Sequence, residues 1–431
     1  MRSSVNSKAF QAVACMLQLK PNQPILLALS GGPDSLLLLD LLLEYQKRSP
    51  LTFAVAHVDH GWRKESADEA KILEDLVLSK KIPFHGMQLC IKNCKGNLES
   101  FCREERLQFF RTLSQKWGYV ATLLGHHADD RAETTLKRLF EGASLFQMHG
   151  MRQIQVLDGL EVWRPLLFLT KKEILQEGKK RGLLPFIDPT NQDERFLRSR
   201  MRKRLIPQLS ETFGKEVSSR LCAFAEESLE LQEFLETLSA PFLKKRNEGV
   251  MGVWYDLKEV PSSDFQLKYL IKKILEKEGE FLSKESIALA AVWLRGQVSN
   301  KTLQSKKTRV FVDRGYLFFL QQAFTFLDWE LHYKTGEKNT NACWKQLFSG
   351  QMTLSLPLRD YKIVSPREGA SFRSLWNEKK VPAFLREAVP LLCDEKGNLY
   401  ELLSGKTFKD CEEEEEQVNL TIRLKLDFVH F

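Results

Sequence analysis

The chain has 431 residues, of which 43% are hydrophobic and 28% charged, and its formal net charge is +8. This balance excludes a disordered or fibrous chain, and the length predicts two or three domains, of which we expect three. The basic excess fits a polyanionic partner, although many ordinary proteins are as basic.

No apolar run approaches the roughly 18 residues that a membrane span needs, and the N-terminus lacks the pattern of a signal peptide. We therefore expect a cytoplasmic protein. Its eight cysteines are widely spaced and form no Cys-x-x-Cys pair. This usage favours reduced thiols and predicts no metal site built from them.

Short β-rich runs alternate with longer amphipathic runs from residue 25 to about residue 140. The expected strands are Ile25–Leu29, Thr52–His57, Pro83–Leu89 and Tyr119–Leu124, and the expected helices are Asp34–Lys47, Ser66–Ser79, Leu98–Trp117 and a fourth from Asp129. This alternation predicts an α/β fold, a doubly wound parallel sheet with helices on both faces. Ligands of such sheets bind beyond the carboxyl ends of the strands, where the strand order reverses.

The rest of the chain is expected to form two further domains. Residues 211–330 predict a mainly helical middle domain with a late hairpin, and residues 331–431 predict a small mixed α+β domain. The helices are expected at Ser219–Leu238 and Phe265–Lys277, the hairpin at Thr308–Val312 and Tyr316–Leu320, and later strands at Gln351–Leu356, Tyr361–Val364, Leu399–Leu403 and Val418–Leu424.

One glycine-rich segment lies between an expected buried strand and an expected helix: Ser30-Gly31-Gly32-Pro33-Asp34-Ser35. Two glycines let backbone N–H groups approach a ligand, the helix N-terminus carries partial positive charge, and two serines add hydroxyl donors. Together these features indicate a phosphate cradle. No lysine stands where a Walker loop needs one. Taken alone, the segment fits a simple turn equally well.

A second polar segment, His57-Val58-Asp59-His60-Gly61-Trp62-Arg63, follows the second expected strand. Its position at a strand tip favours contact with a nucleotide, with Asp59 available to a ribose, an amino group or Mg²⁺. The alternative is a polar loop with surface histidines.

A third polar segment, residues 125–134, contains two adjacent histidines and three acidic residues. Asp130 and Glu133 are three residues apart on an expected helix and share a face, which suits an ammonium group or a cation. A zinc site is disfavoured because adjacent His126 and His127 cannot easily both point inward. The aspartates would also stabilise the N-terminus of a helix through its dipole.

Arginines cluster in two places. Arg103 and Arg106 lie in residues 97–106, and residues 195–204 contain five more: Arg195, Arg198, Arg200, Arg202 and Arg204. Most arginines are surface charge, but the planar guanidinium pairs with two oxygens, so these clusters favour contacts with a triphosphate or RNA.

The glycine-rich segment resembles the Ser-Gly-Gly-x-Asp-Ser loop of the ATP pyrophosphatases, the PP-loop family, which cleave ATP between the α and β phosphates. With the other segments in order over residues 25–210, the chain is similar to the tRNA(Ile)-lysidine synthases. The resemblance also covers Asn97–Arg106, Asp188–Asn191, Phe196–Arg202, Arg367–Ala370 and Val381–Arg386. The chain departs from the family at Arg131, where glutamine is common, and at Cys102, where alanine is common.

The resemblance implies an adenine nucleotide alpha hydrolase-like catalytic domain over residues 1–210, a tRNA-contacting domain over 211–330 and a tRNA-binding domain over 331–431. It implies that free L-lysine is ligated to C2 of the wobble cytidine of an isoleucine tRNA with a CAU anticodon. The reaction would consume ATP and require Mg²⁺. An adenylated cytidine would form, and AMP and diphosphate would be released. The modified tRNA would read AUA instead of AUG, and the protein would be a monomer or homodimer without membrane contact.

Motif by motif, the resemblance also implies roles for individual residues. Those expected to bind the nucleotide are Ser30, Gly31, Gly32, Pro33, Asp34, Ser35 and Asp59. Those expected at the reacting centre are Asp34, His127, Asp130 and Arg198. Those expected to bind lysine or tRNA are Arg103, Arg106, Asp130, Glu133, Lys306, Lys307 and Arg309.

Two alternatives remain open at this point. Another PP-loop tRNA-modifying enzyme, chiefly a thiolase, is disfavoured because thiolases often depend on Cys-x-x-Cys pairs, which the chain lacks. A non-catalytic RNA-binding protein is disfavoured because a decayed loop would not be expected to keep Asp34, Asp130 and Glu133.

Overall fold

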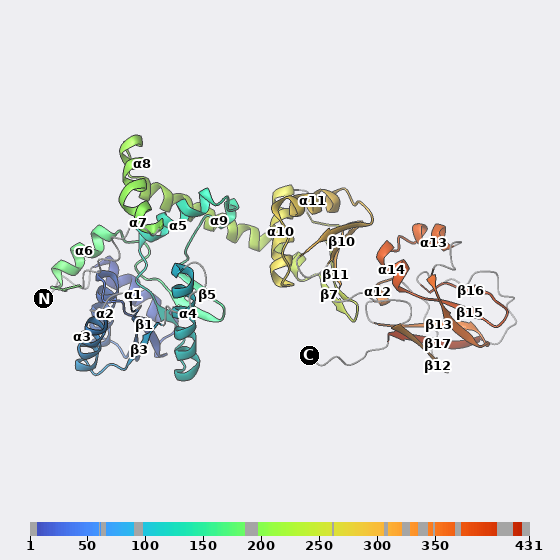
Figure 1. The fold of residues 1–431 in the computed structure, drawn as a ribbon, viewed down its shortest axis with the longest axis horizontal. Helices are drawn as coiled ribbons and strands as arrows, with labels where there is room; N and C mark the ends of the chain where they lie inside the picture. The colour runs from blue at the N-terminus through green and yellow to red at the C-terminus, as the bar shows by residue number, and fades with distance from the viewer. Residues whose placement is uncertain are drawn as a thin grey trace. The chain divides into compact units, whose positions relative to one another are not determined.

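The computed structural model describes residues 7–59, 61, 66–89, 98–185, 197–260, 263–305, 309–320, 328–334, 344–347, 350–366, 372–402 and 417–424 (Figure 1). The chain divides into two compact units, residues 1–233 and 234–431, and each is described by itself. Several segments singled out above lie outside the described residues: His60, Trp62, Arg63, Asn97, Asp188–Asn191, Arg195, Phe196, Lys306, Lys307 and Arg367–Ala370.

The first unit is built on a six-stranded sheet in the order β3-β2-β1-β4-β6-β5. The strands are β1 Ile25–Ala28, β2 Phe53–Asp59, β3 Phe84–Gln88, β4 Thr122–Leu123, β5 Ile154–Leu157 and β6 Leu160–Trp163. All neighbouring strands pair in parallel except β5, which pairs antiparallel with β6 at one edge. The predicted parallel sheet is therefore confirmed. The β5–β6 hairpin, which turns at Asp158 and Gly159 with positive φ angles, was not predicted.

Helices cover both faces of this sheet, as the alternating pattern predicts. The helices described over residues 1–243 are α1 Lys8–Leu19, α2 Pro33–Gln46, α3 Ser66–Ser79, α4 Leu98–Trp117, α5 Ala128–Phe140, α6 Lys171–Lys180, α7 Leu197–Arg200, α8 Ile206–Phe213 and α9 Val217–Leu243, with a π-helical turn over Met201–Leu205 between α7 and α8. One core contains buried side chains of α1, α2, α3 and α6, and a second contains those of α4. The observed bounds of α3 and α4 equal the predicted ones.

The position of the glycine-rich segment follows from the burial of its neighbours. Leu26 and Leu27 of β1 are fully buried, and α2 buries apolar side chains around most of its circumference. A helix that is apolar on nearly all sides is stable only when other elements cover it. The β1–α2 connection is therefore fixed at both ends by the core. It follows the carboxyl end of β1, the strand that lies between β2 and β4.

The described residues of the second unit form three antiparallel sheets. The first has the order β7-β8-β11-β10-β9 and packs with helices α10 and α11 around one core. Its elements are β7 Arg246–Gly249, β8 Gly252–Asp256, β9 Lys301–Gln304, β10 Arg309–Asp313, β11 Tyr316–Leu320, α10 Asp264–Lys277 and α11 Lys284–Arg295. The predicted hairpin is present as β10 and β11, and the middle of the chain contains more strands than the prediction gave.

The two remaining sheets each have three strands, in the orders β12-β17-β13 and β14-β15-β16. Their elements are β12 Trp329–Lys334, β13 Gln351–Pro357, β14 Tyr361–Val364, β15 Leu391–Asp394, β16 Leu399–Tyr400, β17 Gln417–Leu424, α12 Trp344–Leu347, α13 Arg373–Glu378 and α14 Ala383–Ala388. Strands and short helices share one core, so this part is mixed α+β as predicted. No helix within the described ranges has the length and apolar character needed to cross a membrane.

Candidate active site

The connection between β1 and α2 has the geometry of an anion cradle. Gly31 has a φ of +81°, which L side chains rarely adopt, and Gly32 caps α2. The Ser35 hydroxyl donates to the Gly32 carbonyl over 3.1 Å and accepts from the Ser30 N–H over 3.1 Å. Because the first N–H groups of a helix have no partner within it, the closed loop offers them to a bound anion.

Gly125 lets the segment after β4 approach this loop closely. A Cβ atom at Gly125 would lie 3.1 Å from the Asp34 Cβ and 3.2 Å from the Ser35 nitrogen. Any side chain there would force the loop to shift. The absence of a side chain thus brings residues 125–134 against the loop, at the reversal of strand order between β1 and β4 where a ligand site was predicted.

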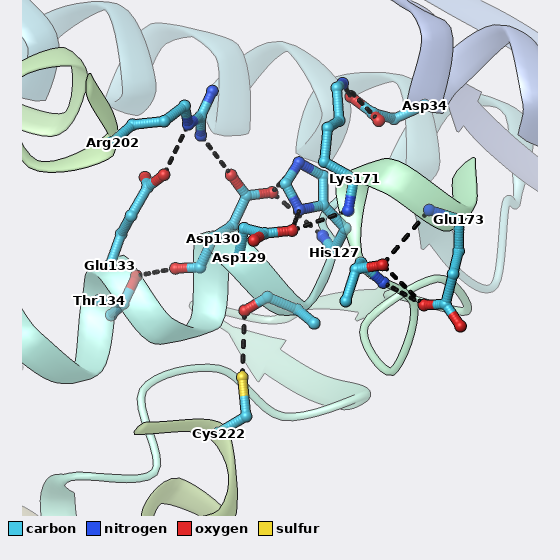
Figure 2. Close-up of polar contacts among 12 residues, drawn as sticks. Asp34, His127, Asp129, Asp130, Glu133, Thr134, Lys171, Glu173, Arg202 and Cys222 are labelled. Atoms are coloured by element: carbon cyan, nitrogen blue, oxygen red, sulfur yellow. Dashed lines mark hydrogen bonds and ion pairs between the residues drawn. The ribbon is translucent and has the colours of Figure 1, made fainter. Parts of the chain in front are cut away.

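Lys171, the first residue of α6, supplies a cation to the loop (Figure 2). Its Nζ lies 2.7 Å from both carboxylate oxygens of Asp34, and its backbone N–H donates to Asp129 Oδ2 over 2.7 Å. Thr170 and Glu173 form a capping box that fixes the start of α6. Lys171 was not predicted, since the Thr-Lys-Lys-Glu run indicates the start of a helix but does not identify a partner 137 residues away.

His127 lies between two carboxylates at the start of α5. Its side chain is 3% exposed, with Nδ1 3.4 Å from Asp129 Oδ2 and Nε2 3.4 Å from Asp130 Oδ2. Burial alone lowers the pKa of His127, but the interaction with Asp129 and the charge of Asp130 outweigh it, and the pKa is raised. The same interaction with His127 lowers the pKa of Asp129. Burial favours the neutral form of Asp130, yet the charge of His127 and further charges and hydrogen bonds lower its pKa too.

The raised pKa of His127 makes a testable contribution to stability. A group whose pKa is higher in the folded state stabilises the fold below its unfolded pKa, here 6.5, and this contribution disappears as the pH rises through the folded pKa. We therefore expect the difference in unfolding free energy between the wild type and His127→Gln to be largest below pH 6.5 and to shrink as the pH rises through the folded pKa. Each unit of pKa difference contributes about 1.4 kcal/mol. Chemical denaturation across this range measures the difference, and a difference that stays constant would contradict the charged pair.

Arg202 joins the two acidic residues that were predicted to share a face of α5 (Figure 2). Its Nε lies 2.6 Å from Glu133 Oε1 and its Nη2 lies 3.0 Å from Asp130 Oδ1. The Glu133 and Asp130 side chains are 3% and 12% exposed, whereas that of Arg202 is 44% exposed. Burial raises the pKa of Glu133 although Arg202 opposes this shift. The other carboxylate oxygen of Glu133, Oε2, is buried and has no hydrogen-bond partner.

His126 has a different environment from its neighbour. Arg164, almost fully buried, donates from Nε to His126 Nδ1 over 3.1 Å and from Nη1 to the Arg152 carbonyl over 2.8 Å. Burial lowers the pKa of His126 to about 3, with Asp130 opposing and Arg164 adding to the shift. The ring is therefore neutral near pH 7, and because Nδ1 accepts, the proton resides on Nε2. Arg164 was not predicted, because a lone arginine carries no local signal.

Three of the predicted arginines belong to the same neighbourhood. Burial, then the charges of Arg103 and Arg198, lower the pKa of Arg106 to about 10. Burial and the charge of Arg103 likewise lower the pKa of Arg164 to about 10. Like charges held together in this way are suited to a polyphosphate, because an anion with several oxygens relieves their repulsion.

Two further predicted residues, Asp59 and Arg309, lie at the ends of strands. Asp59 is the last residue of β2 and accepts from the Gly61 N–H over 2.8 Å, so it stabilises a turn. The β2 strand extends to Asp59, two residues beyond the predicted end, because its pairing with β3 continues. Arg309 begins β10 in the second unit and is exposed. Lys306 and Lys307 lie outside the described residues.

Metal-binding groups and a reactive thiol are two further features that a catalytic site can contain. In the part of the chain that the structure describes, no group of three or more His, Cys, Asp or Glu side chains could hold a metal ion. Cys222 of α9 donates to the Ala128 carbonyl over 3.3 Å, and burial raises its pKa to about 11 (Figure 2). A thiol with so high a pKa is a poor nucleophile near pH 7.

Comparison with known proteins agrees with this geometry. Residues 2–209 match a family model described as a PP-loop domain, the class of ATP-binding fold that the strand order and the loop define. The chain is 33% identical to a tRNA(Ile)-lysidine synthase of Protochlamydia amoebophila over 429 residues, covering 94% of each protein. It is 39% identical to a tRNA(Ile)-lysidine synthase of Chlamydia muridarum over 300 residues, which cover 68% of this chain and 92% of that one. The chain belongs to the tRNA(Ile)-lysidine synthase family.

Among solved structures, the chain is similar to a U34-tRNA thiolase of Methanococcus maripaludis. The TM-score is 0.44 at 19% sequence identity, and the match covers 52% of this chain and 78% of that one.

Proposed function

We propose that this chain uses ATP to ligate L-lysine to C2 of the wobble cytidine in an isoleucine tRNA with a CAU anticodon. Family membership supports the reaction, and one observation carries its assignment to a site. The phosphate cradle and the carboxylate pair of α5 belong to one continuous set of contacts, from Asp34 through Lys171 and Asp129 to His127 and Asp130. A site of this kind can hold a triphosphate and an ammonium group side by side.

In the first step, the C2 oxygen of cytidine attacks the α-phosphate of ATP, and diphosphate leaves. The N–H groups at the start of α2 and the Lys171 ammonium, 2.7 Å from Asp34, bind the departing charge. Arg103, Arg106 and Arg198 bind the nucleotide or the tRNA phosphates, and Asp59 remains a proposed nucleotide contact. Mg²⁺ would be held by Asp34 and the phosphates, since this ion commonly uses one or two carboxylates with substrate oxygens, and it would neutralise phosphate charge.

In the second step, the amine of lysine attacks C2 and AMP leaves. Asp130 and Glu133 are the acceptors for the lysine ammonium, which must lose a proton before it can attack. Glu133 is suited to receive this proton because burial raises the pKa of its carboxyl group. His127, held between Asp129 and Asp130, keeps both aspartates in place.

The rest of the chain is proposed to bind the tRNA in the cytoplasm. Residues 1–210 would carry the chemistry, 211–330 would contact the tRNA, and 331–431 would bind it, with Lys306, Lys307 and Arg309 as candidate contacts. The high pKa of the Cys222 thiol disfavours a thiolase reaction at this centre.

Incubation of the purified protein with labelled lysine, the isoleucine tRNA, ATP and Mg²⁺ tests the proposal. Label should enter the tRNA only when ATP is present, with AMP and diphosphate as co-products. A methionine tRNA with the same anticodon letters provides the matched control and should remain unlabelled. Release of ADP, or incorporation of sulfur instead of lysine, would overturn the assignment.

A further inference from the structure

The ammonium site of α5 is already filled by a cation of the protein. Arg202 uses two guanidinium nitrogens to bind Glu133 and Asp130, at 2.6 and 3.0 Å. These are the same two carboxylates that the proposed function assigns to the lysine ammonium. A guanidinium and an ammonium cannot occupy the same position, so the two cations must compete for at least one carboxylate oxygen.

The exposure of the three side chains shows which partner can leave. Glu133 and Asp130 are 3% and 12% exposed, while Arg202 is 44% exposed. Separating a buried carboxylate from the cation that it is hydrogen-bonded to is costly, unless another cation replaces it. An exposed arginine, by contrast, regains water when it is displaced. Arg202 is thus the partner that can be exchanged, and the acids are the fixed receptor.

The backbone under Arg202 allows such a movement. Arg202 lies in the π-helical turn Met201–Leu205, which interrupts the helix between α7 and α8. A π turn contains one more residue than an α turn and is common at functional sites, because the extra residue can be accommodated or released locally. Arg202 also leaves the acceptor capacity of Glu133 partly unused, since the buried Oε2 has no hydrogen-bond partner while Arg202 is bound.

We propose that Arg202 is an internal placeholder that occupies the lysine ammonium site on Asp130 and Glu133 until the substrate lysine displaces it. The inference rests on the proposed function, because it takes lysine as the incoming ligand. With the placeholder bound, the two acids remain neutralised and close to each other. The cost is a lower affinity for lysine, since only the fraction of molecules with Arg202 displaced can bind it.

Equilibrium dialysis of the full chain with labelled L-lysine tests the placeholder. Arg202→Ala should bind lysine about tenfold more tightly than the wild type, as expected if Arg202 occupies the site in about nine molecules out of ten. Lys137→Ala is the matched control, because Lys137 is an exposed cation of α5, the helix that contains Asp130 and Glu133, and pairs with Glu141 at 3.7 Å. Its lysine affinity should equal that of the wild type.

A second measurement distinguishes a placeholder from a structural ion pair. Millimolar guanidinium should compete with lysine in Arg202→Ala, because the small cation fills the vacated position, and should have much less effect on the wild type. Weaker or unchanged lysine binding in Arg202→Ala, or no competition by guanidinium, would overturn the placeholder while leaving the proposed function intact. Absence of lysine binding to both proteins would instead remove the lysine site and the proposed function with it.

Discussion

Replacing Lys171 by methionine should slow the adenylation of tRNA by about 10²- to 10³-fold, the usual effect of removing one group that stabilises transition-state charge. The reason is positional. The Lys171 Nζ, 2.7 Å from both Asp34 oxygens, is the cation that the contacts place beside the phosphate cradle. A Walker loop would carry such a lysine within its own sequence, and here the start of α6 provides it.

Diphosphate release in a single turnover, measured with enzyme in excess over tRNA, checks this prediction. Lys172→Met removes the next, exposed lysine of α6 and should leave the rate unchanged. Lys171→Arg keeps the charge and should retain part of the rate. Equal losses in adenylation and in tRNA affinity would mean that Lys171 supports the fold of the site and not the transition state.

Much of the first unit could be predicted because the information is local. The amphipathic spacing of residues 66–79 and 98–117 predicted the bounds of α3 and α4, and the glycines of the loop predicted the turn between β1 and α2. The i, i+3 spacing of Asp130 and Glu133 predicted that one cation could bind both, and Arg202 does so. These predictions depend only on the geometry of one helix or one turn.

The contacts of the site that were not predicted join residues far apart in the sequence. Lys171 meets Asp34 across 137 residues, Arg164 meets His126 across 38, and Arg202 meets Glu133 across 69. Such pairs form only when the sheet and its helices assemble. Neither Lys171 nor Arg164 carries a local signal, and the arginine cluster that contains Arg202 did not identify Glu133 as its partner. The nucleotide contact expected at Asp59 stays a prediction, and the Asp59 carboxylate accepts from the nearby Gly61 backbone N–H.

Adenylation and lysine transfer depend on different residues, so a substitution of Asp130 should slow the second step and not the first. Asp130→Asn should slow the transfer of lysine by about 10²- to 10³-fold, the usual effect of removing one charge that is held in place at a reacting centre, because Asp130 binds the ammonium group whose proton Glu133 receives. It should change adenylation much less, because the cradle is formed by α2 and Lys171. Asparagine keeps the shape of the side chain but loses the charge that attracts an ammonium group and contacts His127.

The variant should therefore release one diphosphate per tRNA and accumulate adenylated tRNA, which can be isolated and treated with wild-type enzyme and lysine. Completion of the reaction by the wild type would identify the accumulated species as the true intermediate. Asp40→Asn is a suitable control, since Asp40 of α2 pairs with Arg181 at the end of α6, at 2.8 Å. This substitution is expected to affect stability alone. If Asp130→Asn slowed both steps equally, the carboxylate would act on the whole site through His127, and the assignment of lysine to α5 would fail.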